Sequence, residues 1–299
     1  MNAAPSGFRS GFAALVGRPN VGKSTLLNAL VGKKLSIVTP RPQTTRHRIV
    51  GIVDLAQAQI AFVDTPGLHR EARRALNKAM NRTASTALAD ADLNVLVVEP
   101  LKWTPEDELA LASIARSGRP ALVAVNKIDR VRPRGRLLPY LAELPRRHDF
   151  RAIVPVSALR GENLEELRQT IAAQLPESAP LYPRGELTDR SQTFRIAELI
   201  REKLTLELNQ EVPYGIAVEV ERVAEEGEQL AVDAAIWVDR NGQKPIVIGA
   251  QGARLKRVGR AARLAVNELL GRRVHLRLWV KVRENWADNA RALRQLGVE

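Results

Sequence analysis

Hydrophobic residues in the first part of the chain occur as short runs separated by longer helical patterns. Five runs are apolar at consecutive positions, as strands buried on both faces of a parallel sheet are; they span residues 12–16, 60–63, 93–98, 121–125 and 153–156. The alternation continues to about Leu175. It predicts an α/β domain with a mostly parallel sheet.

A proline-rich stretch then interrupts the pattern. Residues 175–185 contain Pro176, Pro180 and Pro183, and proline neither continues a helix nor donates to a strand ladder. We therefore expect a first domain over residues 1–178, a linker over 179–190 and a second domain over 191–299.

The second domain has a different pattern. A helix is predicted from residue 191 to about 208, with Asp189 or Ser191 as its N-cap. Hydrophobic residues alternate in 214–223 and 230–238 around a turn at 225–228, which indicates a half-buried antiparallel hairpin. A short strand at 245–248, a helix at 253–270 and a last strand at 274–282 follow. This part is expected to be α+β, without an internal repeat.

Composition narrows the class of protein. The chain has 299 residues, enough for two domains, and 45% of them are hydrophobic. It has no cysteine, which excludes disulfides and thiolate chemistry and agrees with a cytoplasmic location. No apolar run approaches the ~20 residues of a membrane span, and no signal peptide is visible. We expect a soluble, unexported protein.

Positive charge is concentrated in one segment. The chain carries 46 Lys and Arg against 33 Asp and Glu, a formal net charge of +13. Residues 244–283 alone hold 11 basic side chains and 1 acidic one. Such a concentration indicates a polyanionic partner rather than a merely solvated surface.

A phosphate-binding pattern follows the first predicted strand. The octapeptide Gly17-Arg18-Pro19-Asn20-Val21-Gly22-Lys23-Ser24 matches G-x-x-x-x-G-K-[ST] and opens the apolar helix that begins near Thr25. Glycines allow the backbone N–H groups to face phosphates at a helix N-terminus. Lys23 is placed to reach the β and γ oxygens, and the Ser24 hydroxyl to ligate Mg²⁺.

Three further motifs follow predicted strands. Asp64-Thr65-Pro66-Gly67 offers a carboxylate for Mg²⁺ and the Gly67 N–H for a γ-phosphate. Asn126-Lys127-Ile128-Asp129 offers a carboxylate suited to guanine, and Ser157-Ala158-Leu159 ends the series. The carboxyl ends of strands are where an open α/β sheet binds its ligand. The Asp129 carboxylate argues against the rival class of ATP-dependent kinases or motors.

In their order, these elements resemble the translation-factor-related small GTPases. The resemblance implies that a switch threonine ligates Mg²⁺; Thr45 is favoured, and Thr44 is the alternative. Where Ras-like enzymes carry a glutamine that orients the attacking water, this chain has Leu68, which predicts slow intrinsic hydrolysis. Relatives with a hydrophobic residue there use a monovalent cation, so K⁺ bound in part by Asn20 is expected. We interpret His69 as a surface residue rather than a base.

The basic segment contains a second motif. Gly249-Ala250-Gln251-Gly252 is a G-x-x-G loop before a helix, as in KH domains, which bind RNA. Along that helix Leu255, Val258, Ala262, Ala265 and Leu269 form an apolar stripe, whereas Lys256, Arg257, Arg260 and Arg263 project to the other side. A membrane-surface helix is the rival, but the stripe lacks Trp and Phe. Of the tryptophans, Trp279 is expected in the core, and Trp286 is open between core and base stacking.

The whole chain resembles the Era family of bacterial GTPases. Supporting signatures include Gln43-Thr44-Thr45-Arg46-His47-Arg48-Ile49, Thr188-Asp189-Arg190-Ser191 and Glu284-Asn285-Trp286. The resemblance implies a GTPase of small-ribosomal-subunit assembly that binds the 3′ end of small-subunit ribosomal RNA through a type II KH domain. It also implies peripheral association with the inner membrane. Our hypothesis is that Mg²⁺·GTP gates RNA binding; the alternative is a constitutive RNA-binding protein that holds nucleotide as a structural ligand.

These considerations define four sets of candidate residues. The catalytic set is Lys23, Thr45 and Gly67, and the metal set is Ser24, Thr45 and Asp64. The nucleotide set is Gly17, Arg18, Pro19, Asn20, Val21, Gly22, Lys23, Ser24, Thr25, Asp64, Thr65, Pro66, Gly67, Leu68, Asn126, Lys127, Ile128, Asp129, Ser157, Ala158 and Leu159. The RNA-binding set is Ile248, Gly249, Ala250, Gln251, Gly252, Arg254, Lys256, Arg257 and Arg260.

Overall fold

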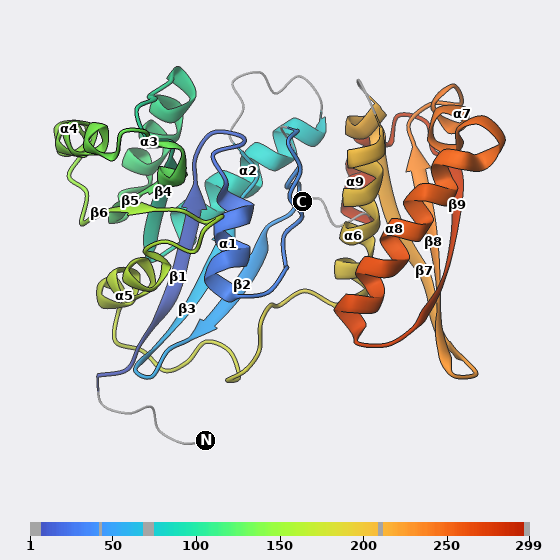
Figure 1. Cartoon of the computed structure of the whole chain (residues 1–299), viewed down its shortest axis with the longest axis horizontal. Helices are drawn as coiled ribbons and strands as arrows, with labels where there is room; N and C mark the ends of the chain where they lie inside the picture. Colours follow the sequence, from blue (N-terminus) through green and yellow to red (C-terminus); the bar gives the residue numbers. More distant parts are fainter. Residues whose placement is uncertain (1–6, 42–43, 68–74, 209–211, 296–299) are drawn as a thin grey trace. The chain divides into compact units, whose positions relative to one another are not determined.

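The fold was determined as a computed structural model that describes residues 7–41, 44–67, 75–208 and 212–295. The chain divides into two compact units. The first holds most of the chain up to Asp189, and the second holds the chain from Arg190 onward (Figure 1). The predicted order of an α/β domain followed by an α+β domain is confirmed.

The first unit is built on a six-stranded sheet in the order β2-β3-β1-β4-β5-β6. Only β2 runs antiparallel to its neighbour. The strands are β1 (Arg9–Val16), β2 (Ile49–Asp54), β3 (Ala58–Asp64), β4 (Leu93–Val98), β5 (Ala121–Asn126) and β6 (Ile153–Val156). The helices are α1 (Lys23–Val31), α2 (Ala75–Asp90), α3 (Pro105–Ser117), α4 (Leu137–Glu143) and α5 (Leu164–Gln174). All five predicted strands are present.

The edge strand β2 was not predicted from the sequence. Its apolar run is interrupted by Gly51, which weakens a strand signal. The structure explains the glycine, because a Cβ at this position would lie 2.7 Å from side-chain atoms of Leu27 and Val31 on α1. Close packing of α1 on the sheet therefore requires glycine at position 51, and the same glycine weakens the sequence signal of the strand.

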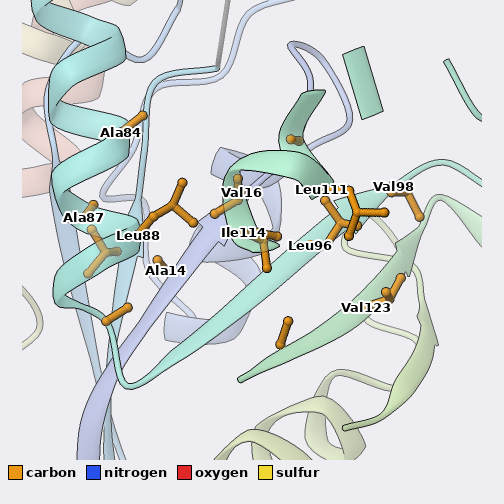
Figure 2. Packing of buried hydrophobic residues seen from close by; sticks show 14 of the residues in the cluster. Ala14, Val16, Ala84, Ala87, Leu88, Leu96, Val98, Leu111, Ile114 and Val123 are labelled. Carbon is orange, nitrogen blue, oxygen red and sulfur yellow. The ribbon is translucent and has the colours of Figure 1, made fainter. Parts of the chain in front are cut away.

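Apolar side chains fill the space between the sheet and its helices. On one face, Ala84, Ala87 and Leu88 of α2 and Leu111 and Ile114 of α3 pack over side chains of β1, β4 and β5 (Figure 2). On β1 the alternate residues Ala13 and Leu15 are equally buried, and α1 and α5 pack against this strand. The sheet is covered on both faces, as its continuous apolar strands predict.

The proline-rich stretch is bonded to the first unit. The amide of Ser178 donates to Phe8 O (3.0 Å), the amide of Ser10 to Pro176 O (3.1 Å) and the amide of Ile52 to Leu187 O (2.9 Å). Hydrogen bonds thus hold this segment along the strands of the first unit as far as Leu187.

The second unit has a three-stranded mixed sheet in the order β7-β8-β9. Its strands are β7 (Ile216–Glu226), β8 (Gln229–Val238) and β9 (Val274–Val282), and its helices are α6 (Gln192–Glu207), α7 (Gln243–Ile248), α8 (Ala253–Leu270) and α9 (Ala290–Gln295). β7 and β8 are antiparallel, and β8 and β9 are parallel. Ser191 is the N-cap of α6, since its hydroxyl accepts from the amide of Phe194 at 3.2 Å.

Three expectations for this unit are wrong. Residues 245–248 belong to the short helix α7 instead of a strand, because a run of four apolar residues has no decisive period and a proline is tolerated in the first turn. The hairpin turn is shorter than 225–228, as β7 continues to Glu226. The hairpin is not simply half-buried, because the central strand β8 is buried along almost its whole length.

The packing of this unit shows whether Trp279 and Trp286 belong to its hydrophobic core. Ile196 and Ile200 of α6 and Val258 and Val266 of α8 pack against the sheet. Trp286 is only 1% exposed, and its indole N–H donates to Gly215 O at 3.1 Å. It is therefore a core residue and not a stacking surface. A fourth expectation is wrong: Trp279 is not in the core but only partly buried on the edge strand β9. The Lys281 ammonium lies 5.7 Å from its ring centre.

Candidate nucleotide site and nucleic-acid groove

The segment between β1 and α1 curls into a loop that only small residues permit. Gly17 and Gly22 have φ of 156° and 100°. A Cβ at Gly17 would lie 2.3 Å from Val97 O, and a Cβ at Gly22 would lie 2.4 Å from Asn126 Nδ2. The first amides of α1 then close the loop, as the sequence pattern predicts.

Lys23 lies at the start of α1 and is buried. Its ammonium donates to Gly17 O (2.8 Å) and Arg18 O (3.1 Å), both in the loop. Burial lowers the pKa of Lys23 to about 8, although the nearby Asp64 carboxylate opposes the shift. A cation that is costly to bury in this way is stabilised by a polyanion that enters the loop.

Three predicted oxygen ligands meet beside Lys23. The Ser24 hydroxyl lies 2.8 Å from Thr45 Oγ1 and donates to Asp64 Oδ2 at 2.7 Å. The Thr45 hydroxyl is 3.4 Å from the same carboxylate oxygen. Ser36, which the sequence analysis missed, also donates to it at 2.7 Å. The hydroxyl of Thr44 instead donates to Arg41 O at 2.8 Å, so Thr45 and not Thr44 joins the cluster.

The Asp64 carboxyl is completely buried. Its Oδ1 atom has no hydrogen-bond partner among the residues that the structure describes. Burial raises the pKa of this carboxyl, opposed by Lys23 and the hydroxyl donors. A buried carboxylate oxygen without a donor, next to hydroxyl oxygens, fits the preference of Mg²⁺ for hard oxygen ligands.

The rest of the Asp64 motif packs against the phosphate loop. Thr65 is buried, and its hydroxyl donates to Leu15 O at 2.9 Å. Gly67 approaches Pro19 so closely that a Cβ would lie 3.1 Å from the proline ring. Leu68 and His69 lie outside the described residues.

Hydrogen bonds join the Asn126 motif to the phosphate loop and to the Ser157 motif. The Asn126 amide donates to Val21 O (3.0 Å) and accepts from the amide of Ala158 (3.0 Å). The Ser157 hydroxyl donates to Asp129 Oδ1 at 2.6 Å, and the Lys127 ammonium donates to Asn20 O at 2.6 Å. The structure therefore brings together the phosphate loop, the Asn126 motif and the Ser157 motif. Leu159 is 72% exposed beside them.

Glu99 is a residue of this site that sequence reasoning missed. Its carboxylate accepts from Arg18 Nη2 of the phosphate loop at 2.5 Å and from the Lys127 ammonium. Burial alone would raise the pKa of Glu99, but Lys127 and Arg18 outweigh it and lower the pKa. Arg18 is also paired with the buried Asp107. The signal was available, because Glu99 follows strand β4 as the other motifs follow their strands.

In the second unit, the G-x-x-G loop joins α7 to α8. Gly249 and Gly252 both have φ of 76°, and Gln251 has φ of 48°. A Cβ at Gly249 would lie 2.7 Å from the Arg254 Cβ, so glycine allows the loop to fold back on the helix start. The loop backbone is thereby exposed to a ligand that approaches α8.

A cavity of about 770 Å³ begins at this loop and follows α8. Its walls include Leu255, Leu276 and Leu278, and its cationic side chains are Lys256, Arg257, Arg260 and Arg263. The predicted Gly252, Lys256, Arg257 and Arg260 thus line one groove, together with Arg263, which was not in the candidate set. We call this cavity the KH groove.

The other predicted RNA-binding residues have different surroundings. Ile248 packs partly into the hydrophobic core, and Gly249, Ala250 and Gln251 form the loop itself. The guanidinium of Arg254 is bonded to Ile246 O. None of these five residues lines the KH groove among the described residues, so a contact from them to RNA stays a prediction.

The fold defines a class of protein in which a phosphate-loop nucleotide-binding domain is joined to a KH-like domain. Comparison with known proteins agrees: the model of the 50S ribosome-binding GTPase family matches residues 12–127, and that of the KH domain matches residues 211–287. No helix in the described part of the chain is long and apolar enough to cross a membrane.

Individual relatives identify the family within that class. GTPase Era of Marinobacter nauticus is 49% identical over 97% of this chain and 95% of its own length. GTPase Era of Xanthomonas oryzae pv. oryzae is 48% identical over the full length of both chains. The chain belongs to the Era family of GTPases, and its enzymatic activity is GTP hydrolysis.

Solved structures of the family have the same fold. A crystal structure of an Aquifex aeolicus Era variant bound to GDP·AlF4⁻ covers 97% of this chain and 99% of its own, with a TM-score of 0.93 and 39% identity. A structure of Era with MgGDPNP and nucleotides 1506–1542 of 16S ribosomal RNA has the same coverage, TM-score and identity.

Proposed function

We propose that this GTPase is an assembly factor of the small ribosomal subunit. In this proposal it binds the 3′ end of small-subunit ribosomal RNA in the KH groove, and Mg²⁺·GTP gates the binding. Residues 1–178 act as the GTPase domain, 179–190 as a linker and 191–299 as the RNA-binding domain. The observation that carries the proposal is a cationic groove at a G-x-x-G loop on the same chain as a GTP site.

Guanine selection is assigned to Asp129. Guanine presents N–H donors on the edge where adenine does not, and a carboxylate accepts them. The bond from Ser157 holds Asp129 in one orientation, and the bonds of Asn126 hold the flanking loops. The expected result is a strong preference for GTP over ATP.

Mg²⁺ binding is assigned to Ser24, Thr45 and Asp64. The donor set consists of hydroxyl and carboxylate oxygens, and the buried Asp64 Oδ1, which accepts no hydrogen bond from the described residues, is the observation that best fits a cation ligand. When bound, the metal neutralises charge on the β and γ phosphate oxygens. Lys23 binds the same oxygens, and the Gly67 amide orients the γ-phosphate.

Slow intrinsic turnover is part of the proposal. Leu68 has no hydrogen-bonding group that could orient the attacking water. The amide nitrogen of Asn20 donates to Pro40 O at 3.2 Å, which leaves the Asn20 amide oxygen to face a monovalent cation. We expect K⁺ to accelerate GTP hydrolysis relative to Na⁺. Equal rates in the two salts would refute this role of Asn20.

RNA binding is assigned to the G-x-x-G loop and the basic face of α8. Lys256, Arg257 and Arg260 neutralise phosphates, which gives affinity that falls steeply with salt. The loop backbone clamps the nucleotide chain, and unstacked bases reach the apolar wall of the groove. Arg257 is paired with Glu207 at 3.2 Å, so a phosphate at Arg257 must compete with that carboxylate.

The test is RNA affinity in two nucleotide states. A labelled oligonucleotide from the 3′ end of small-subunit ribosomal RNA is titrated at fixed salt with Mg²⁺ and either GDP or a non-hydrolysable GTP analogue. Tighter binding with the analogue by about tenfold, or about 1.4 kcal/mol, is expected for gating. Equal binding would contradict gating and favour a constitutive RNA-binding protein. An absence of binding in both states would contradict the RNA assignment.

Peripheral association with the inner membrane completes the proposal. The net charge of +13 favours attraction to anionic lipid headgroups. Cosedimentation with anionic vesicles, compared with neutral vesicles at the same salt, measures it. Equal pelleting with both would refute an electrostatic association.

A further inference from the structure

Arginines are concentrated in a segment that follows the Asn126 motif and lies outside the predicted nucleotide set. Arg130, Arg132, Arg134 and Arg136 occupy alternate positions between the Asn126 motif and α4. All four are exposed. Arg134 pairs with Glu162 at 3.0 Å. In the described part of the chain, no carboxylate forms an ion pair with the other three.

The three arginines line one cavity. Its volume is about 160 Å³, and Arg130, Arg132 and Arg136 share it with Lys127. The single acidic residue of the lining is Glu99. That carboxylate is already bonded to Arg18 and Lys127. The cavity therefore has an excess of positive charge that its own walls do not neutralise.

Like charges held together repel one another, and an anion that binds among them removes the repulsion. Guanidinium groups donate two parallel hydrogen bonds to a phosphate, which suits them to phosphodiesters. The three side chains are exposed as well as sharing this cavity, so phosphates of a chain that runs over the protein surface can reach them. A nucleic acid carries such a phosphate at every nucleotide, which makes its backbone a ligand of matching charge.

We propose that Arg130, Arg132 and Arg136, here called the arginine surface, bind the phosphate backbone of RNA as a site separate from the KH groove. The inference rests on the proposed function, since the same RNA would supply both contacts. A membrane is the less suitable partner. Of the apolar residues in the lining, Val131 is buried and Leu101 is 38% exposed, and the lining has no aromatic residue to insert into lipid.

The experiment compares two RNAs and two variants of the full chain. The long RNA is the stretch present in the Era complex, nucleotides 1506–1542. The short RNA is a single strand of about 10 nucleotides from its 3′ end, enough for a KH groove. One variant is R130Q/R132Q/R136Q. The matched control, K78Q/R82Q/R116Q, removes three exposed cations from α2 and α3 of the same unit. Unchanged GTP affinity and melting temperature establish that both variants fold.

The arginine variant is expected to bind the long RNA about 10-fold less tightly or worse. The salt dependence of binding, as log Kd against log salt, should also become shallower by about 2, since each lost phosphate contact removes about 0.7 from the slope. Binding of the short RNA and all binding by the control variant should match the wild type.

Several results would overturn the inference. An unchanged slope for the long RNA would do so, as would an equal loss in the control variant. Loss of binding to anionic phosphatidylglycerol vesicles with unchanged binding of the long RNA would assign the surface to lipid instead. If K256Q lowers affinity for the short RNA while the arginine variant binds both RNAs normally, only this inference fails. If the wild type binds neither RNA, the proposed function and this inference fail together.

Discussion

The GTP site and the KH groove, which we propose binds RNA, are built in opposite ways. The GTP site collects residues from the ends of separate strands and fixes them by buried hydrogen bonds, such as those of Asp64 and Asn126. The KH groove takes its cations from consecutive turns of one helix, and they are exposed. Buried, mutually dependent contacts fail as a unit, whereas exposed charges act almost independently. The two sites should therefore respond differently to single substitutions.

The largest effect is expected from Lys23→Ala. This change removes a buried cation that is aimed at the phosphates, and loss of a desolvated charge contact costs about 2–5 kcal/mol. GTP affinity should fall by about 30-fold to 5,000-fold, as measured with a fluorescent GTP analogue. Lys33→Ala, which removes an exposed lysine just beyond α1, is the control. A Lys23→Ala protein with wild-type affinity would show that the phosphate loop does not bind in the assigned way.

The pH dependence of stability gives a second test of the buried site. The pKa of Lys23 is about 8 in the folded protein and 10.5 as the ordinary value. Between these values the unfolded chain binds more protons, so the nucleotide-free protein gains stability as pH rises. The gain attributable to Lys23 approaches about 3 kcal/mol at pH 10.5. Chemical denaturation of wild type and Lys23→Met from pH 7 to 10 measures the difference. A constant difference would contradict the burial of a charged lysine.

Glu99→Gln tests whether the GTP site fails as a unit. The substitution leaves Arg18 and Lys127 without their shared carboxylate, at a position that is one-fifth exposed. Affinity for GDP and GTP should fall together by about 10-fold, or about 1.4 kcal/mol, with kcat unchanged because its partners Arg18 and Lys127 are outside the catalytic set. Glu106→Gln, an exposed carboxylate on α3, is the control. A fall in kcat at unchanged affinity would assign Glu99 a different role.

The smallest effect is expected in the KH groove. Lys256→Gln removes one exposed phosphate contact, so RNA affinity should fall about 3-fold and the salt slope by about 0.7. Arg260→Gln should act similarly, and the double variant should show the sum of the two free-energy changes. Strong non-additivity would mean that this groove is as interdependent as the GTP site.

Local sequence pattern was sufficient to predict a helix, strand or loop where the evidence lies within that one element. The helix at 253–270 agrees with the structure at both ends, because a long amphipathic run has an unambiguous helical period. The strands at 93–98 and 153–156 also agree at both ends, although such short apolar runs have no period of their own. Residues 245–248 were wrong because a four-residue apolar run fits a strand and a buried helix equally well.

Contacts between segments that are distant in the sequence could not be predicted from local sequence pattern. Gly51 reads as a poor strand residue, yet it lies in β2 because α1 packs on it. Trp286 was open between stacking and core until the partner of its indole N–H was known. Glu99 binds residues 81 and 28 positions away, and no local period records such a pairing.

The sequence by itself determined the class of the protein, its family resemblance and the positions of the phosphate and base motifs. These follow from residue types at short, fixed spacing, which local backbone geometry and hydrogen-bonding chemistry require. Only the tertiary structure decided which of two adjacent threonines meets Asp64 and which carboxylate links Arg18 to Lys127. It also decided which cations line a common groove. Those outcomes depend on distances across the fold, which packing sets and sequence spacing does not contain.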